Sequence, residues 1–160
     1  MKSLSIGDLN IKLPIIQGGM GIGISMSRLA SAVANEGGVG VIAAVGIGMF
    51  EKNYRRDFID ANIRALRREI QTAREKTTGV IGVNVMVALT NFSDLVKTAV
   101  AEKVDIIFSG AGLPMNLPEY LTKGAKTKLV PIVSSGRAAD ILCKKWKTLY
   151  DYLPDAFVVE

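Results

Sequence analysis

Short apolar runs alternate with amphipathic segments along almost the whole chain. The apolar runs contain little polar alternation and end in glycine, serine or another polar residue, which is typical of strands buried on both faces of a sheet. They lie within residues 13–19, 39–46, 79–87, 104–112, 128–135 and 155–160. The pattern predicts six short strands, of which the first comprises about four residues of the run LPIIQGG.

The segments between these runs have the periodicity of helices. They cover residues 25–38, 53–76, 92–103, 116–125 and 136–149. In the longest segment, an apolar residue recurs at steps of four and three, which places one stripe beneath a charged face. The residues of that stripe are Ile59, Ile63, Leu66, Ile70 and Ala73.

Local signals also predict helix ends and inward faces. Ser25 or Ser27 can cap the first helix, Gly37 can end it, and Ser93 can cap the third helix. Pro118 suits the first turn of the short fourth helix. The positions expected to face inward are Leu29, Ala32, Val33 and Ala34 in the first helix, and Leu95, Val96, Ala99 and Val100 in the third.

Five βα units followed by a sixth strand predict a parallel sheet covered by helices, in one domain over residues 1–160. Two architectures compete. A doubly wound sheet requires a phosphate fingerprint in its first turn, but GGMGIGIS has Ile24 in place of the third glycine. GVGVIA at 38–43 matches the fingerprint but lies within a strand and opens no helix.

A TIM barrel fits the strand ends better. Small or hydrogen-bonding residues follow or end the strands, and parallel strands bring such residues to one face. They are Gly18 and Gly19, Asn84, Ser109 and Gly110, Ser134 and Ser135, and Glu160. We therefore expect an α/β fold of the TIM (β/α)8 type, here with the first five βα units and strand six, about two units short of a full barrel.

Composition narrows the chemistry. The chain has no histidine and a single cysteine, Cys143, which argues against a zinc site and excludes Ser-His-Asp or Cys-His catalysis within these residues. If the chain is an enzyme, its chemistry depends on a cofactor or on residues beyond this sequence. One cysteine and the lack of a signal peptide or a long apolar run favour a cytoplasmic protein without a membrane segment.

The net charge of +5 does not indicate nucleic-acid binding. Residues 51–76 mix eight basic with five acidic residues. Residues 123–147 carry seven basic residues and one acid, but no aromatic platform is interleaved with them. We interpret both segments as solvated surface and expect a small-molecule substrate as the partner.

The motifs PIIQGGMGIGIS, EGGVGVIAA, GVNVMV, SGAGLP and VPIVSS, in this order and spacing, resemble the nitronate monooxygenase (2-nitropropane dioxygenase) family. The flavin-dependent enoyl-acyl-carrier-protein reductases are close relatives of that family. The resemblance implies an FMN-binding TIM barrel in which the first glycine loop lies against the flavin ring. Glycines suit that role because the backbone can approach a flat ring without an intervening Cβ.

The resemblance implies a set of cofactor contacts: Gly18, Gly19, Met20, Gly21, Asn84, Ser134 and Glu160. These contacts have alternatives: the glycines can simply form a tight turn, and Met20 can fill a gap in the packing. Asn84 interrupts an apolar strand, and a buried amide needs a partner, which is either the flavin edge or the backbone of a neighbouring strand. Ser134 either lines the pocket or caps the following helix. We interpret Cys143 and Trp146 as packing residues.

In the family, strand six leads into an A-G-G-H segment with the presumed catalytic base, and the FMN phosphate site is built from the loops after strands seven and eight. We therefore expect no catalytic residue in this chain, which resembles the N-terminal part of such an enzyme. We also expect the chain alone to bind FMN weakly or not at all. The expected partner is the remaining half or a second copy. The implied activity is FMN-dependent oxidation of alkyl nitronates; the alternatives are NAD(P)H-dependent enoyl reduction and a non-catalytic half-barrel.

Overall fold

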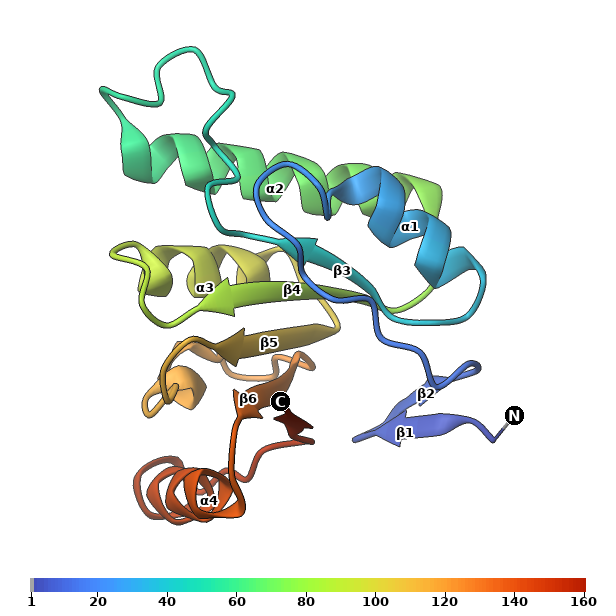
Figure 1. Ribbon diagram of the computed structural model, residues 1–160, viewed down its shortest axis with the longest axis vertical. Coiled ribbons are helices and arrows are strands. Elements are labelled where there is room, and N and C mark those ends of the chain that lie inside the picture. The colour runs from blue at the N-terminus through green and yellow to red at the C-terminus, as the bar shows by residue number, and fades with distance from the viewer. Residues whose placement is uncertain (1) are drawn as a thin grey trace.

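The computed structural model describes residues 2–160 and contains a five-stranded parallel sheet in the order β3-β4-β5-β6-β7 (Figure 1). The strands are β3 (Gly40–Ala43), β4 (Ile81–Met86), β5 (Ile106–Gly110), β6 (Lys128–Val133) and β7 (Val158–Val159). The connecting helices are α1 (Ser27–Asn35), α2 (Phe58–Lys76), α3 (Phe92–Ala101), the 3-10 helix η1 (Leu117–Tyr120) and α4 (Gly136–Tyr150). The order of strands in the sheet follows the order in the sequence, as in part of a barrel wall.

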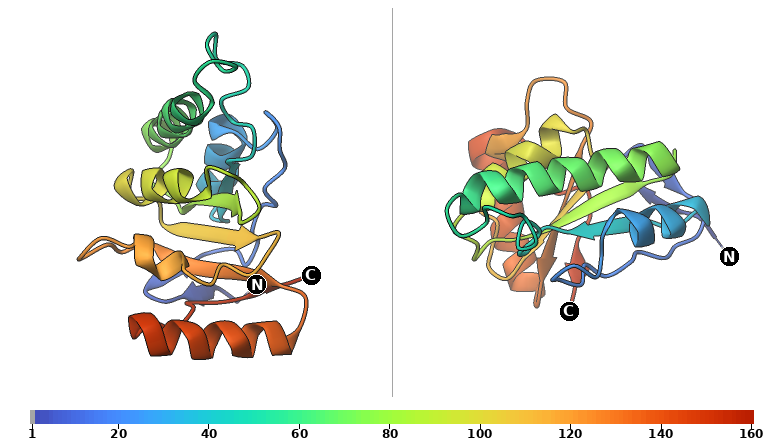
Figure 2. Two further views of the ribbon diagram at one scale, coloured as in Figure 1. Left: turned by 90° about the vertical axis from the view of Figure 1, so that its left-hand side faces the viewer. Right: turned by 90° about the horizontal axis from the view of Figure 1, so that it is seen from above.

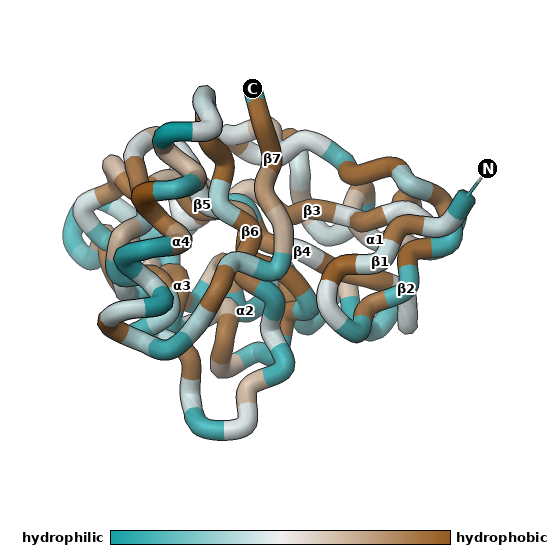
Figure 3. Tube along the Cα trace, turned by 90° about the horizontal axis from the view of Figure 1, so that it is seen from below, coloured by the Kyte–Doolittle hydropathy of each residue, from teal (hydrophilic) through white to brown (hydrophobic). Residues whose placement is uncertain are grey.

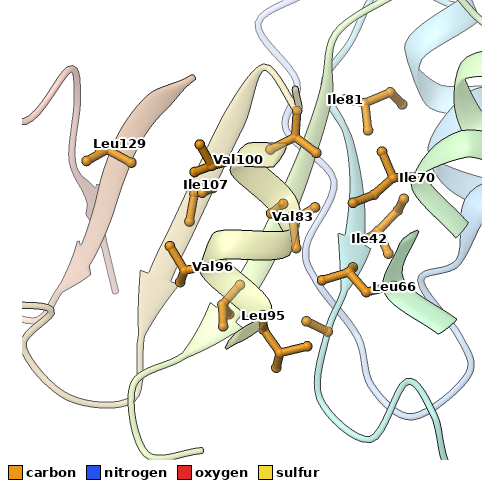
Figure 4. Packing of buried hydrophobic residues seen from close by; sticks show 14 of the residues in the cluster. Ile42, Leu66, Ile70, Ile81, Val83, Leu95, Val96, Val100, Ile107 and Leu129 are labelled. Carbon is orange, nitrogen blue, oxygen red and sulfur yellow. The ribbon is translucent and has the colours of Figure 1, made fainter. Parts of the chain in front are cut away.

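The outer face of the sheet carries the larger apolar core. Because successive side chains of a strand point to opposite faces, one alternating set from each strand packs against α2 and α3. Figure 4 shows Ile42, Val83 and Ile107 from three neighbouring strands facing Leu66 and Leu95 of these helices. All five are fully buried, so helix packing on this face holds the strands together.

The inner face carries a second, smaller cluster. It contains the other alternating set, including Val41, Phe108 and Val130, together with Ile6 and Ile11. The latter two come from an N-terminal hairpin of β1 (Leu4–Ile6) and β2 (Leu9–Ile11), which are paired antiparallel. Figure 2 shows the N-terminal segment on the side of the sheet opposite α2 and α3. The hairpin therefore covers the inner face near the amino ends of the strands.

The predicted first strand is wrong in extent. Residues 13–19 contain only an isolated parallel bridge between Ile16 and Val39, and Ile15 is 51% exposed. The backbone of this segment is bonded to Val39, the residue before β3: the N–H of Val39 donates to Ile15, and its carbonyl accepts from Gln17. The side-chain amide of Gln17, rather than the backbone that follows it, forms the hydrogen bonds to Val41. After Gln17 the main chain turns into the glycine loop. A regular ladder thus has no second residue pair on which to form.

Of the four residues of helix α1 predicted to face inward, only Ala34 is buried. Ala30 and Ala34 are buried, whereas Leu29 is 43% exposed. The cause is the close approach of α1 to β3, where a Cβ on Gly40 would lie 1.9 Å from the carbonyl oxygen of Ala30. Only small residues fit this contact, so the helix turns its alanines rather than its leucine toward the strand.

Several predicted helix ends also differ. Residues 53–56 form turns, Asp57 is the N-cap, and α2 begins at Phe58. The N-cap positions of α1 and α3 are Met26 and Asn91, and neither makes a side-chain capping bond. Gly37, with φ of +90°, follows the end of α1 as predicted. The inward residues predicted for α3 are all buried, and the apolar stripe of α2 is buried from Leu66 onward.

No helix among residues 2–160 is both long and apolar enough to cross a membrane.

Candidate functional site

A hollow of about 440 Å³ lies on the inner face of the sheet, toward the carboxyl ends of the strands. This volume is within the usual range for small-molecule sites. Neighbouring strands contribute inward-facing side chains, and the first loop forms the remaining wall. The lining residues are Ile16, Gln17, Gly18, Gly19, Met20, Val41, Asn84, Phe108, Ile132, Val158 and Glu160.

The register of the sheet explains why these side chains meet. Asn84 of β4 is paired with Phe108 of β5, and Ile132 of β6 is paired with Val158 of β7. Each pair belongs to the alternating set that faces away from α2 and α3. Figure 3 shows β7, hydrophobic along its length, running beside β6 to the C-terminus.

The glycine loop of residues 18–24 is closed by one buried hydroxyl. Ser25 Oγ accepts a hydrogen bond from the backbone N–H of Met20 at 3.0 Å and donates to the carbonyl of Gly18 at 3.1 Å. It also accepts from Nε2 of Gln17 at 3.1 Å. Ser25 is only 2% exposed. The predicted capping role of this serine is replaced by a role inside the loop.

Asn84 and Gly19 lie in direct contact across the hollow wall. A Cβ on Gly19 would lie 2.6 Å from Cβ of Asn84. Within residues 2–160, the side-chain amide of Asn84 has no hydrogen-bond partner, and neither does the backbone of Gly19. The alternative in which the Asn84 side chain bonds a neighbouring strand therefore does not apply. Both residues leave donors and acceptors directed at the hollow or its solvent.

The structure gathers five of the seven predicted contact residues around the hollow. These are Gly18, Gly19, Met20, Asn84 and Glu160. Gly21 is not among the lining residues and packs against Val45, whose Cγ1 would lie 2.2 Å from an added Cβ. Ser134 is exposed and does not line the hollow. Binding of a cofactor by any of the seven stays a prediction.

The capping role considered for Ser134 belongs to the next residue. Ser135 is the N-cap of α4, and its Oγ accepts a hydrogen bond from the backbone N–H of Ala138 at 3.2 Å. Because β6 ends at Val133, Ser134 lies between the end of the strand and the N-cap of α4. The contacts of the Ser134 side chain therefore support neither of its predicted roles, which were to line the pocket or to cap the following helix.

Sequence reasoning missed several lining residues, among them Gln17, Phe108 and Ile132. The sequence contained a signal for each of them. Phe108 and Ile132 lie an even number of positions from other inward-facing residues of their strands, and Gln17 directly precedes the glycine loop. The missing information was which of the two faces of each strand is the inner one. An unbroken apolar strand does not reveal this.

Charge is nearly absent from the hollow. Glu160 is its single ionisable lining residue, and no lysine or arginine lines it. The remaining lining is apolar apart from Gln17, Asn84 and the loop backbone. Such a wall suits a flat, uncharged ring with polar edges, and it does not suit a phosphate group.

A larger hollow of about 550 Å³ lies at the opposite ends of the strands, between the hairpin turn and residues 122–127. Asp8 lines it and bonds Nζ of Lys128 at 2.5 Å, and this hydrogen bond lowers the pKa of the Asp8 carboxyl. Parallel α/β barrels bind their ligands at the carboxyl ends of the strands. We therefore assign the functional site to the smaller hollow.

No cluster of three or more potential metal ligands occurs among the described residues. Among the residues that line the hollow, Glu160 is the only one whose side chain is a common metal ligand. The polar groups available there are amides and backbone groups, which bind organic ligands rather than hold transition metals.

Together, the parallel half-barrel and its hollow define an α/β barrel-type fold with a candidate ligand site toward the carboxyl ends of the strands. The chain belongs to the nitronate monooxygenase family, whose profile matches residues 2–160. This assignment confirms the resemblance found in the five sequence motifs. No curated protein gives a significant match.

The similar solved structures include two enzymes that are compared with the chain below. FabK from Thermotoga maritima is 32% identical, with a TM-score of 0.66 over 84% of this chain and 38% of the FabK chain. A nitroalkane oxidase from Streptomyces ansochromogenes is 19% identical, with a TM-score of 0.70 over 93% of this chain and 46% of the oxidase. The latter similarity is one of fold. The chain thus spans less than half the length of these structures, and the barrel-type fold is confirmed.

Proposed function

We propose that this chain forms the ring-binding part of an FMN-dependent oxidoreductase that oxidises alkyl nitronates. Membership of the nitronate monooxygenase family supports this reaction class. The observation that carries the proposal is the pair of neighbouring groups without protein partners, the Asn84 amide and the Gly19 backbone, at the wall of an apolar hollow.

The residues of the hollow fit a flavin ring. Gly18 has no atom within 4 Å of the position of a Cβ, so a flat group can approach its backbone. The Asn84 amide can donate to and accept from the mixed polar edge of an isoalloxazine. Phe108 and Ile132 provide apolar surface on the strand side. A bound flavin supplies electron transfer, and its electronics depend on hydrogen bonds to its ring.

The chain's own residues have a binding and orienting role in this proposal. The glycine loop holds one side of the ligand and excludes water from it. Asn84 fixes the orientation of the ligand edge within the plane of the hollow. Glu160 places the only charge at the rim, where its carboxylate disfavours an anionic group. The base that takes a proton from the substrate and the phosphate site are assigned to sequence outside residues 1–160.

The test is a comparison of riboflavin and FMN as ligands of the 160-residue chain. We expect the two to bind with similar, weak affinity, because the hollow lacks a cation for the phosphate. Fluorescence titration measures both. Tighter binding of FMN than of riboflavin by more than about tenfold, or sub-micromolar FMN binding, contradicts this division of the site.

A second candidate is NAD(P)H-dependent enoyl reduction, which the 32% identity with FabK favours. The two activities differ in the electron donor. Anaerobic mixing of the flavin-loaded full-length protein with propane 2-nitronate, and separately with NADPH, distinguishes them. Bleaching of the flavin absorption by the nitronate alone supports the first activity, and bleaching by NADPH alone supports the second. Reduction of the bound flavin by neither donor contradicts both activities.

A further inference from the structure

We propose that Gln17 and Ser25 are positioning residues, which hold the glycine loop in the conformation that receives the ligand. The role rests on the proposed flavin site but concerns different residues from those expected to contact the ring edge. It follows from two hydrogen-bonded arrangements that join the loop to β3.

The first arrangement is the replacement of a strand by a side chain. The backbone N–H of Gln17 donates to the carbonyl of Val39, the residue before β3, at 3.0 Å, and this is the last backbone bond between the two segments before the loop. One pair further along, Gln17 Oε1 accepts from the N–H of Val41 at 3.3 Å, and Nε2 donates to the Val41 carbonyl at 3.0 Å. The amide thus satisfies the open edge of β3 while the main chain departs.

The second arrangement anchors the far end of the loop. The N–H of Ser25 donates to the carbonyl of Met20 at 2.9 Å, and the carbonyl of Ser25 accepts from Ala43 at the end of β3, also at 2.9 Å. Ser25 Oγ binds Met20, Gly18 and Gln17 at the same time. Both ends of the loop are therefore tied to β3, and the tie passes through one hydroxyl.

This network matters for binding because the loop is rich in glycine. Glycines have many accessible backbone conformations, and without a tie the loop would populate several of them. Ligand affinity falls in proportion to the fraction of molecules with a competent loop. The network uses the Gly18 carbonyl and the Met20 N–H, and it leaves the backbone of Gly19 free for a ligand.

The decisive variant is Ser25→Ala, with Ser31→Ala as its matched control. Ser31 is also buried, at 4% exposure, but its Oγ donates to the carbonyl of Arg28 inside α1. Each variant loses one buried serine hydroxyl, and only the first loses the tie of the loop. The measurements are riboflavin affinity, the visible absorption band of bound riboflavin, and hydrogen exchange of the Met20 amide without ligand.

We expect Ser25→Ala to weaken riboflavin binding by about tenfold, to shift the absorption band, and to speed exchange at Met20. Ser31→Ala should change none of these, whatever its melting temperature. If Ser25→Ala does not fold by circular dichroism, Gln17→Met takes its place, because it keeps the length of the side chain and removes both amide functions. The same three changes are then expected.

Wild-type affinity and an unshifted band in Ser25→Ala overturn the positioning role, even if Met20 exchanges faster. Equal losses in Ser25→Ala and Ser31→Ala also overturn it, since they indicate a general loss of stability. Failure of the unaltered chain to bind riboflavin is a different result. Such a failure contradicts both the proposed function and the positioning role. Riboflavin binding by the wild type is therefore measured before any variant is compared.

Discussion

The side chain of Asn84 in β4 fills the space that a side chain on Gly19 would occupy. A Cβ on Gly19 would lie 2.6 Å from Cβ and 2.9 Å from Cγ of Asn84. Gly19 does not have the positive φ that commonly requires glycine, so close contact rather than a turn explains the residue type at this position. The first loop and the third predicted strand are therefore fitted to each other at the wall of the hollow.

Replacement of Gly19 by alanine should disturb this fit. We expect Gly19→Ala to lower the free energy of unfolding by about 1–3 kcal/mol, the usual cost of overpacking. Gly18→Ala is the matched control, because no atom lies within 4 Å of its added Cβ. Urea unfolding of both variants measures the difference. Equal stability of the two variants would mean that the loop moves away from Asn84 without cost.

Asn84→Ala tests the unpaired amide. We expect the melting temperature to stay close to that of the wild type, because the amide has no partner among residues 2–160. Flavin affinity in the full-length protein should fall by up to about tenfold for each hydrogen bond lost. The flavin redox potential should also change. Cofactor retention and melting temperature are measured on the same preparation.

Asn62→Ala is the control for that experiment. Asn62 is 1% exposed; its Oδ1 accepts from the N–H of Gly48 at 3.0 Å and its Nδ2 donates to Phe58 at 2.7 Å. This variant should lose stability and keep its flavin affinity. A destabilised Asn84→Ala protein with full flavin content and an unchanged spectrum would identify Asn84 as a structural amide.

Asp105 stabilises the amino ends of two strands. Its Oδ2 accepts from the backbone N–H of Ile81 and from Nη2 of Arg74, each at 2.7 Å. Asp105→Ala should lower the free energy of unfolding by about 1–3 kcal/mol, because a part-buried N–H loses its acceptor. The exposed pair of Asp140 and Lys144 offers the control, since Asp140→Ala should leave stability nearly unchanged. Similar losses in the two variants, measured in urea, would contradict this assignment.

Tyr152 should make stability fall in alkaline solution. Burial and a hydrogen bond from its hydroxyl to Asp155, at 2.6 Å, raise its pKa above the ordinary value of 10.0. Above that pH the unfolded chain releases the phenolic proton while the folded chain retains it, so the contribution of Tyr152 is complete below pH 10 and declines above it.

The measurement is the melting temperature of the wild type and Tyr152→Phe between pH 8 and pH 11, roughly the range that brackets tyrosine ionisation. We expect the wild type to lose more stability than the variant over this range. Tyr152→Phe also removes the hydrogen bond to Asp155, so it should be less stable at pH 8. Parallel curves for the two proteins would rule out a shifted tyrosine.

Much of the secondary structure could be predicted from local patterns. The runs around Val83 and Ile107 are apolar without alternation because both faces of these strands are buried, and the prediction of a parallel sheet followed from that. Asn84 stood out for the same reason, as an amide in the middle of such a run. The hairpin was not predicted, because its strands Leu4–Ile6 and Leu9–Ile11 are too short to show a period.

Alternating apolar and amphipathic segments were enough to determine the βα order, because strands buried on two faces and helices buried on one face have different apolar patterns. The small and hydrogen-bonding residues at the strand ends then favoured a barrel over a doubly wound sheet. The tertiary structure alone decided that Gly19 meets Asn84 and that the amide of Gln17 replaces a strand beside Val41. Each of these contacts joins distant parts of the chain. They depend on the register of neighbouring strands and the path of a glycine loop, neither of which a local pattern encodes.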